Sequence, residues 1–509
     1  MMRVELSDSR KMKAADEAAI HGRGIPSLKL MERAAGAVAK AAAELAGKTR
    51  TAVAFCGPGN NGGDGIAAAR ILMDMGFAPV RCFLVGDREK MTEDARAMER
   101  ELQSAGGTLE SFDAGGGDLW ETVKSAGVLV DALFGVGLSR PLAGDALAAV
   151  RFMNGSGRPI VSADIPSGVS ADTGAILGDA VRAARTVTFS MAKPGHYIEP
   201  GCTCRGNLTV EDIGIPADIL AQAGCGVYAI HAGDLALPAR RPLSHKGDYG
   251  KLLILAGSVG YTGAASLCAR AAVRSGAGLV YLGVPADIYE IEAVKNDEAM
   301  VFPLAGNGAG RLSREAAPAI GRRLRGCDVC VLGPGLGRDE DTAAVTASVL
   351  GSAEGPLVLD ADALWAVSRD LSVLKQAPGP VILTPHEGEF ARLLGRPVTD
   401  RLTDAMAFAR TNRCAVVLKG HRTICAFPDG KGYVIDGGNP GMASGGTGDV
   451  LAGVIGALLG QMNPRRAVVT ACWLHARAGD LAAASYGEYA LSAGDIIGFL
   501  PEAEKEIIR

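Results

Sequence analysis

The sequence predicts an α/β protein of two domains, each built as a parallel β-sheet with helices on both faces. Short apolar runs alternate with helical segments through the whole chain, and this alternation is typical of parallel strands that are buried on both sides. The chain has 509 residues, which is more than one ordinary domain holds. It also contains 69 glycines without a collagen period, so we expect many tight turns and close approaches of backbone to ligand.

The first half is expected to form a Rossmann-like three-layer αβα sandwich. Its predicted strands are 51–56, 128–133 and 160–164. Helical patterns at 66–75 and 92–105 lie between these runs. Residues 8–46 are rich in Ala, Glu and Lys and are expected to form helices that pack around the edge of the domain.

The second half starts the pattern afresh and is expected to form another αβα domain. Its predicted strands are 251–256, 279–284, 328–332, 356–360, 380–384 and 415–419. Gly214-Ile-Pro216 marks the end of the first half, so we place the domains at 1–222 and 223–509. Ligands of such sheets bind outside the carboxyl ends of the strands, and the polar motifs described below follow strand ends.

Charge and hydropathy exclude several classes of protein. The chain carries 52 Lys and Arg against 56 Asp and Glu, whereas nucleic-acid binders usually have a basic surplus. The N-terminus lacks the apolar core of a signal peptide, and the apolar stretch at 450–459 is too short to span a bilayer. We therefore expect a cytoplasmic protein without nucleic-acid or membrane partners.

A glycine-rich motif follows the first predicted strand. Residues 57–65 read Gly-Pro-Gly-Asn-Asn-Gly-Gly-Asp-Gly and precede a helical pattern. Gly57, Gly59 and Gly62 fit a dinucleotide-binding fingerprint, and Asp87 follows the next strand as its ribose-binding acid would. That fingerprint does not need the two asparagines, and a simple turn does not need so many glycines with two amides and a carboxylate. Ordinary Rossmann binding and a structural turn stay open as alternatives.

Two later strand ends add oxygen ligands. Asp131 lies at the end of one apolar run, and Asp164 ends another just before Ile-Pro-Ser167. Because neighbouring strand ends lie at one edge of a sheet, Asn61, Asp131 and Ser167 offer oxygen donors that suit a hard cation. Each of these residues alone is more typical of a helix cap or a turn.

In combination, GPGNNGGDG at 57–65, DALFGVGLSRP at 131–141 and DIPSGV at 164–169 resemble the NAD(P)H-hydrate epimerases. The resemblance covers roughly residues 8–215. It implies that Asp164 contacts the hydrated nucleotide and transfers a proton, and that a potassium ion (K+) is held by Asn61, Asp131 and Ser167. The loops implied to bind the substrate contribute Asn60, Asn61, Gly62, Gly63, Asp64, Gly135, Val136, Gly137, Leu138, Ser139, Arg140 and Pro141.

The second half contains Ser-Gly-Gly-Thr-Gly-Asp at 444–449, followed by an apolar helical pattern. A glycine turn that leads into a helix directs backbone N–H groups to one point, which suits a phosphate or a developing negative charge. Asp449 at this point can accept a hydroxyl proton while the hydroxyl attacks a phosphoryl group. The alternative is that Asp449 only caps a core helix. The chain has no Walker A motif and no protein-kinase signature.

This turn resembles the phosphoryl-transfer turn of the ribokinase-like fold. Together with GSVGYTGA at 257–264, GPGLG at 333–337, TPHEGE at 384–389 and KGHRT at 419–423, it resembles the NAD(P)H-hydrate dehydratases over about residues 235–500. The residues implied to bind the hydrated nucleotide are Gly263 or Ala264, Gly335, His386 and Asp449. Those implied to bind the adenine nucleotide are Lys419, Gly420, His421, Arg422, Thr423 and Gly448.

Two of these assignments have alternatives in the sequence itself. His386, taken alone, is more typical of a loop histidine with satisfied hydrogen bonds. Asp360 and Asp362 either orient a magnesium ion through water or cap the helix that follows them, and we favour the cap.

The resemblance implies an enzyme that repairs NADHX and NADPHX, the hydrated forms of NADH and NADPH. Water adds across the C5–C6 double bond of the reduced nicotinamide ring, and hydroxide is a poor leaving group. Phosphorylation of the hydroxyl, with ADP as the donor and Mg2+, lets phosphate leave and gives AMP and phosphate. The first domain is expected to interconvert the R and S epimers and the second to dehydrate the S epimer. We also expect a homo-oligomer.

Two other functions remain possible from the sequence. A small-molecule kinase of the ribokinase-like fold would explain Asp449 but would leave the first domain without a role. A nucleotide-binding regulator that has lost catalysis would have no need of both Asp164 and Asp449.

Overall fold

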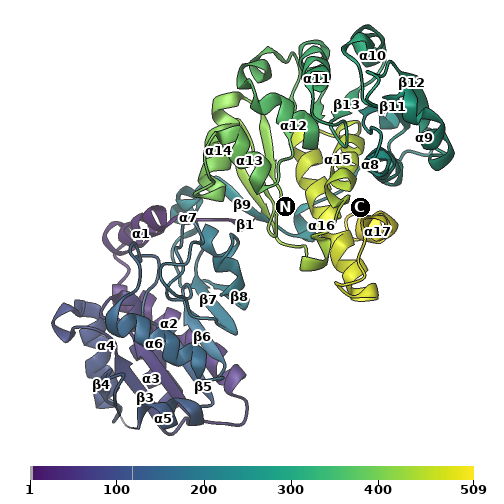
Figure 1. Ribbon diagram of the computed structural model, residues 1–509. Coiled ribbons are helices and arrows are strands. Elements are labelled where there is room, and N and C mark those ends of the chain that lie inside the picture. Colours follow the sequence, from purple (N-terminus) through teal and green to yellow (C-terminus); the bar gives the residue numbers. More distant parts are fainter. Residues whose placement is uncertain (1–3, 117, 509) are drawn as a thin grey trace. The chain divides into compact units, whose positions relative to one another are not determined.

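The computed structural model describes residues 4–116 and 118–508, and the chain forms two compact units (Figure 1). The first unit comprises Val4–Val227, and the second begins at Tyr228. Each contains a mainly parallel sheet with helices packed on it, which confirms the predicted two-domain α/β class. The division of activities at 222/223 stays a prediction. Within the described ranges, no helix is long and apolar enough to cross a membrane.

The sheet of the first unit has the strand order β4-β3-β2-β5-β6-β7-β8, and its strands are parallel. They are β2 (Ala52–Cys56), β3 (Val80–Leu84), β4 (Leu109–Ser111), β5 (Val128–Ala132), β6 (Ile160–Ala163), β7 (Arg185–Phe189) and β8 (Asn207–Glu211). A short strand, β1 (Val4–Glu5), precedes them in the chain and is not part of this sheet. The three predicted strands are confirmed to within one residue. Because the chain reverses its direction across the sheet between β2 and β5, their carboxyl ends form the crevice where such sheets bind ligands.

Helices cover both faces of this sheet, as the three-layer prediction requires. They are α1 (Ser9–Glu17), a π-helix (Ala18–Gly22), α2 (Ser27–Ala46), α3 (Asn60–Asp74), α4 (Glu93–Ser104), α5 (Leu119–Ser125), α6 (Gly144–Gly155) and α7 (Ala217–Ala223). Alternate residues of β2 face opposite layers. Ala54 and Cys56 lie in one apolar core with α2, α3 and α4, whereas Val53 and Phe55 lie in another with α5 and α6.

Helix α3 begins earlier than the sequence pattern indicates. The pattern predicts a helix from residue 66, but α3 begins at Asn60, so most of the glycine motif forms its first turns. The glycines are needed for packing, because a Cβ on Gly62 would lie 1.7 Å from the carbonyl oxygen of Gly57. A Cβ on Gly65 would lie 2.4 Å from the Cβ of Ala132 in β5. Glycine therefore allows the first turns of α3 to lie directly on the strand ends.

The second sheet is longer and mixed. From β9 onward its order is β9-β18-β17-β16-β15-β14-β13-β10-β11-β12, parallel from β16 to β12 and antiparallel between β16, β17 and β18. The strands are β9 (Val227–Ile230), β10 (Lys251–Leu255), β11 (Leu279–Pro285), β12 (Met300–Leu304), β13 (Val329–Leu332), β14 (Leu357–Leu359), β15 (Val381–Leu383), β16 (Ala415–Leu418), β17 (Ile424–Ala426) and β18 (Gly432–Ile435).

The six predicted strands of this half are confirmed to within one residue, but β9, β12, β17 and β18 were not predicted. Strand β12 lies at the edge of the sheet, contains Pro303 and is partly exposed, so it lacks the apolar run of a central strand. Strands β17 and β18 are short and pair with each other in antiparallel fashion. Their apolar runs are therefore shorter than those that predict the parallel strands of this sheet.

Helices also cover both faces of the second sheet. They are α8 (Thr262–Arg274), α9 (Tyr289–Lys295), α10 (Ala317–Leu324), α11 (Glu340–Ser352), α12 (Ala361–Ser368), α13 (Glu387–Leu394), α14 (Arg401–Asn412), α15 (Thr447–Leu459), α16 (Pro464–Tyr486) and α17 (Ala493–Lys505). Leu252 and Ile254 of β10 share one apolar core with α8 and α15 to α17. Helix α12 packs with α11 and α13, and α14 packs on β16 and β17 (Figure 1).

The packing of α3 predicts opposite effects for two glycine-to-alanine substitutions. Gly62→Ala forces a methyl group against the Gly57 carbonyl and should lower the free energy of unfolding by about 3 kcal/mol or more. Gly36→Ala in α2, where a Cβ would meet no atom within 4 Å, should raise it by about 0.5–1 kcal/mol. Hydrogen exchange of the β2 and α3 amides in the full chain measures both changes. A Gly62→Ala protein as protected as the wild type would contradict the close packing.

Candidate active sites

The first unit brings its three predicted strand ends together at the crevice between β2 and β5. The backbone N–H of Gly57, after β2, donates to the carbonyl of Ala132, at the end of β5 (3.0 Å). The backbone N–H of Ser167, after β6, donates to the Asp131 carboxylate (2.9 Å). The glycine motif, the 131–141 loop and the 164–168 loop therefore form one continuous site.

Asp131 is fully buried and holds this site together. Its Oδ2 accepts hydrogen bonds from the Ser162 hydroxyl (2.7 Å) and the Ser167 N–H. Burial raises the pKa of Asp131, against the hydrogen bonds from Ser167 and Ser162, which lower it. The Ser167 hydroxyl in turn accepts from the N–H of Phe134 (3.0 Å), so the 131–141 loop is fixed to the 164–168 loop.

The predicted cation ligands come from α3, β5 and the loop after β6, and two of them, Asp131 and Ser167, are hydrogen-bonded to each other. Asn61 Nδ2 is buried and has no hydrogen-bond partner among the described residues, and a buried donor without a partner is unfavourable. The amide oxygen of Asn61 lies 3.0 Å from the Cβ position of Gly135, in the loop after β5. With Asp131 and Ser167, Asn61 forms a set of oxygen donors that fits a potassium ion.

Asp164 lies beside this set with an unusual backbone conformation, φ 65°. Its Oδ1 accepts hydrogen bonds from the Lys193 ammonium (2.5 Å) and the Thr188 hydroxyl (3.0 Å). Its Oδ2 lies 3.0 Å from the point that a Cβ on Gly135 would occupy, and so does Oδ1 of Asn61. A side chain at position 135 would therefore displace both Asp164 and Asn61.

Lys193 is a residue that the sequence analysis missed. It follows β7, its side chain is 1% exposed, and it forms an ion pair with Asp164. Burial acts to raise the pKa of Asp164, but the Lys193 charge together with the hydrogen bonds from Lys193 and Thr188 outweighs it, and the pKa lies below its usual value. A possible signal is that Lys193 stands in a Lys-Pro-Gly-His segment after a strand, but β7 mixes polar and apolar residues and was not predicted.

Two further carboxylates face Asp164. Asp64 on α3, an expected substrate contact, is buried, and burial together with the charge of Asp164 raises its pKa well above the usual value. Asp16 on α1 was not predicted, and burial raises its pKa to about 6 although Lys193 acts to lower it. The site therefore combines one ionised carboxylate with two that take up protons more readily.

The rest of the predicted 135–141 loop divides into two parts. Leu138 packs against the apolar core under α5 and α6, so its side chain is structural. Gly137 and residues 139–141 are exposed, and the Lys13 ammonium of α1 lies 3.8 Å from the Cβ position of Gly137. The N–H of Val136 donates to Asp164 Oδ2 at 3.3 Å, which places the start of the loop at the site.

The second unit builds its site on the first turn of α15, which begins at Thr447 as the 444–449 motif predicts. Gly446 has φ 93°, a conformation that favours glycine. The Thr447 hydroxyl donates to the carbonyls of Met442 and Ser444 (3.1 Å each). His475 of α16 makes a 2.9 Å hydrogen bond from Nε2 to the Thr447 carbonyl, and burial lowers its pKa to about 4, so it is a neutral donor.

A buried ion pair lies directly against this turn. The Lys419 ammonium donates to Asp360 Oδ1 (2.7 Å), and the Thr384 hydroxyl donates to the same oxygen (2.8 Å). Burial acts to lower the pKa of Lys419, but the charges of Asp360 and Glu389 and the hydrogen bond to Asp360 together outweigh it, and the pKa is raised. The Lys419 ammonium lies 3.1 Å from the Cβ position of Gly448, so a permanent positive charge stands at the N-terminus of α15.

Asp449 lies in the first turn of α15. Burial raises the pKa of Asp449 to about 7, with a further contribution from the charge of Asp360 and an opposing one from Lys419. A carboxylate with a pKa near neutrality can both accept and return a proton at physiological pH.

The expectation that Asp360 and Asp362 cap a helix was wrong. Asp360 occupies the N-cap position of α12, but its side chain makes no capping hydrogen bond and instead pairs with Lys419. Asp362 accepts from the N–H of Gly337 and from Nε of Arg338 (2.8 Å each). Lys419 lies 59 residues from Asp360, so the local pattern around Asp360 contains no sign of this partner.

The predicted contacts for the hydrated nucleotide follow the strands β10, β13 and β15. A Cβ on Gly335 would lie 3.0 Å from the Cβ of Ala264, and Ser258 donates to the Gly335 carbonyl (2.7 Å). Gly263 faces open space. His386 caps α13, because its Nδ1 accepts from two backbone N–H groups of that helix. This leaves Nε2 as the protonated nitrogen on a side chain that is 61% exposed.

The 419–423 segment, predicted to bind the adenine nucleotide, is held by α14. Arg401 of α14 donates to the carbonyls of Lys419 and His421 (3.3 Å each). Thr423 donates to the carbonyl of Gly420 (3.1 Å), and Arg422 forms an ion pair with Asp436. The backbone of the segment is therefore fixed, and the Arg422 side chain is already engaged.

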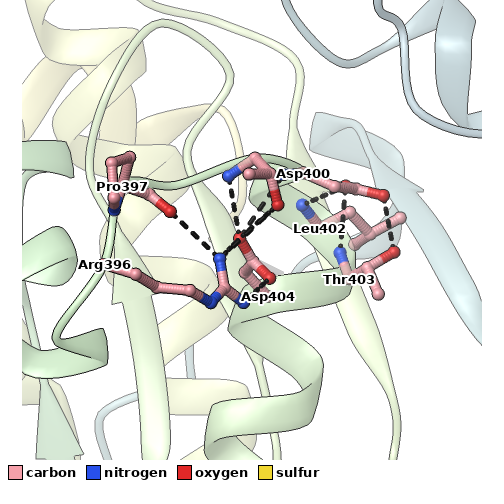
Figure 2. A network of polar contacts seen from close by, with 7 residues as sticks. Arg396, Pro397, Asp400, Leu402, Thr403 and Asp404 are labelled. Atoms are coloured by element: carbon pink, nitrogen blue, oxygen red, sulfur yellow. Dashed lines mark hydrogen bonds and ion pairs between the residues drawn. The ribbon is translucent and has the colours of Figure 1, made fainter.

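The start of α14 is fixed by a network of its own (Figure 2). Arg396 donates to both carboxylate oxygens of Asp404, at 2.6 and 3.1 Å. These hydrogen bonds lower the pKa of Asp404 to about 2. Asp400 caps α14 by accepting from the N–H groups of Leu402 and Thr403. The network positions Arg401, and through it the 419–423 segment.

Comparison with known families assigns each unit. A family model described as YjeF-related protein N-terminus matches residues 27–195. A family model described as NAD(P)H-hydrate dehydratase matches residues 252–502. The two matches lie in separate compact units.

Whole-chain relatives carry both parts. The bifunctional NAD(P)H-hydrate repair enzyme of Moorella thermoacetica is 41% identical over 490 residues, which cover 94% of this chain and 92% of that protein. The enzyme of the same name from Escherichia coli K12 is 35% identical over 485 residues, covering 94% and 89%. A ribokinase-like superfamily protein from Enterococcus faecalis V583 superposes with a TM-score of 0.50 and 28% identity, covering 56% of this chain and 97% of that one.

The electrostatics of Asp449 predict the effect of a substitution at Asp360. Asp360→Asn removes a neighbouring negative charge, so the pKa of Asp449 should fall from about 7 by roughly one unit. It should stay above the usual aspartate value, because burial remains. Asp449 should therefore become ionised at a lower pH in this variant than in the wild type. Carbon-13 NMR titration of labelled aspartates measures this, with Asp495→Asn in the cap of α17 as a control. An unchanged Asp449 titration would rule out repulsion by Asp360.

Proposed function

The chain belongs to the family of bifunctional NAD(P)H-hydrate repair enzymes, and from this premise we propose how its residues carry out the repair of hydrated NADH and NADPH. We assign the epimerase to residues 1–222 and the dehydratase to 223–509. A cytoplasmic location and a homo-oligomeric assembly stay predictions.

In the dehydratase, Asp449 is the general base. Its carboxylate accepts the proton of the C6 hydroxyl as that oxygen attacks the terminal phosphoryl group of the nucleotide. The first-turn N–H groups of α15 and the Lys419 ammonium beside Gly448 face the negative charge of the transferred group. Phosphate then leaves from C6, a proton leaves from C5, and the double bond is restored. The proximity of Asp449 to this positive site carries the proposal.

The adenine nucleotide lies on Lys419 to Thr423 and Gly448, and ADP is the donor. Magnesium supplies charge neutralisation of the nucleotide phosphates when it is bound. Asp360 Oδ2 lies 3.9 Å from the Cβ position of Gly448 and faces this site, so it is the protein oxygen that fits the ion, directly or through water. The hydrated nucleotide contacts Gly263, Ala264, Gly335 and the exposed Nε2 of His386.

In the epimerase, Asp164 accepts and returns a proton during inversion at C6 of the hydrated ring. The substrate lies over residues 60–64 and 135–141, next to Asp164. A potassium ion on Asn61, Asp131 and Ser167 would supply a fixed positive charge for the polar groups of the substrate. The contact of Gly135 with both Asn61 and Asp164 supports placing ion and base on the same ligand.

The dehydratase assignment predicts the behaviour of Asp449→Asn. Given a mixture of R and S epimers with Mg2+ and ADP, the variant should recover NADH at a rate that is lower by about 10²-fold or more, because the general base is lost. Absorbance of NADH measures this, and chromatography should show that the epimers still interconvert. Asp495→Asn should behave as the wild type. A near wild-type rate would remove Asp449 from the mechanism, and equal or faster turnover with ATP would overturn the choice of donor.

The potassium assignment predicts a change in ion dependence. Asn61→Ala removes one oxygen ligand, so the K+ concentration that half-saturates epimerisation should rise about tenfold, while dehydration of the S epimer keeps its rate. Asn154→Ala is the matched control, because Asn154 lies in the same unit and only makes hydrogen bonds to Ala180 and Arg182. An epimerase indifferent to K+ in the wild type would contradict the site.

A further inference from the structure

Lys193 is a charged residue in a place where charges are unfavourable. Its side chain is 1% exposed, and that of Asp164 is 10% exposed. Taking two charges out of water is unfavourable unless the two are paired and further hydrogen bonds satisfy them. Lysine is almost never fully buried without such a partner. Since Lys193 has no surface from which to touch a substrate, its role has to act through Asp164.

The hydrogen bonds divide the two oxygens of Asp164 between different tasks. Lys193 donates to Oδ1 of Asp164 and to the Thr188 hydroxyl (2.8 Å), and Thr188 donates to the same Oδ1. These three groups form a closed triangle. Among the described residues, Oδ2 receives only the N–H of Val136 at 3.3 Å, and it faces Gly135. The carboxylate cannot rotate without breaking two charge-assisted or hydroxyl hydrogen bonds.

The backbone of Lys193 holds Asp164 a second time. The Lys193 N–H donates to Nδ1 of His196, and Nε2 of His196 then donates to the Asp164 carbonyl (2.9 Å). Asp164 has φ 65°, which is unfavourable for a residue with a side chain and persists only where its surroundings enforce it. The Lys193–His196 segment therefore clamps both the carboxylate and the backbone of Asp164.

Resting on the proposed role of Asp164, we infer that Lys193 is a positioning residue for epimerisation. It holds Asp164 by Oδ1, so that Oδ2 is the oxygen that accepts the substrate proton and returns it. No other reactant is consumed. The remaining charged or titratable groups that face Asp164 are His196 after β7, Asp16 on α1 and Asp64 on α3. Of these neighbours, Lys193 carries the positive charge, since burial lowers the pKa of His196 to about 3.

The test uses the full chain with a mixture of R and S epimers, Mg2+ and excess ADP. NADH then forms in a fast phase from the S epimer, which reports the second unit, and in a slower phase limited by epimerisation. Lys193→Ala should slow the second phase about 10²-fold and leave the first unchanged. The kcat of epimerisation should fall while KM changes less than about twofold, because Lys193 does not touch the substrate. Lys124→Ala, an exposed lysine of α5, is the matched control.

Chemical rescue separates positioning from packing. Propylammonium added to Lys193→Ala can restore the missing cation and should raise the slow phase at least tenfold, whereas 1-propanol, of similar size and uncharged, should not. Rescue by both compounds or by neither, in a folded variant, would overturn the inference. If Lys193→Ala does not fold, Thr188→Val decides, because it keeps the ammonium but removes the shared hydroxyl. It should slow the second phase about tenfold, and an unchanged rate would overturn the inference.

The same assay separates failure of this inference from failure of the proposed function. Asp164→Ala should convert only the S fraction at a normal rate. If it still converts the whole mixture quickly, Asp164 is not the proton carrier, and the proposed epimerase mechanism fails together with the role of Lys193. If Asp164→Ala loses the second phase but Lys193→Ala and Thr188→Val keep it, only the positioning role fails.

Discussion

A lysine–aspartate ion pair lies at the carboxyl ends of the strands in each unit. Lys193 and Asp164 are both buried, whereas the Lys419 side chain paired with Asp360 is 19% exposed. In both pairs a threonine hydroxyl donates to the same carboxylate oxygen as the lysine. Buried charges are tolerated only when they are paired and hydrogen-bonded. Each ion pair therefore has to be reached by hydrogen-bonding groups from several strand ends, loops and first helical turns. This requirement fixes how these segments are placed in both sites.

The two pairs give the proposed bases different properties. Asp164 is itself a member of its pair, so the lysine charge holds its pKa below the usual value. Asp449 lies outside the second pair and near the carboxylate of Asp360, and burial raises its pKa to about 7. The first base is ionised whenever substrate arrives. The second changes its protonation near neutral pH, which suits a base that must take up a hydroxyl proton and release it in each turnover.

The sequence alone was sufficient for the elements that have a local signature. Apolar runs located the central strands, and Asp131 near the end of β5 and Asp164 directly after β6 lie at the carboxyl edge of the sheet, as parallel topology requires. Partners distant in the sequence could not be found. Nothing near Asp360 indicates Lys419, and Lys193 follows a strand that mixes polar and apolar residues. The early start of α3 was missed because glycine reads as a loop, although packing against Gly57 requires it there.

Gly135 shows how a backbone position can couple two chemical groups. The point that its Cβ would occupy lies 3.0 Å from both Asn61 Oδ1 and Asp164 Oδ2, so the two oxygens face each other across a residue without a side chain. Asn61 lies in the first turn of α3 and Asp164 directly follows β6, yet any larger residue at position 135 would push both away. A ligand bound over this glycine therefore meets the proposed cation ligand and the proposed base together. The glycine, which has no side chain, therefore sets how closely the proposed cation ligand and the proposed base can approach each other.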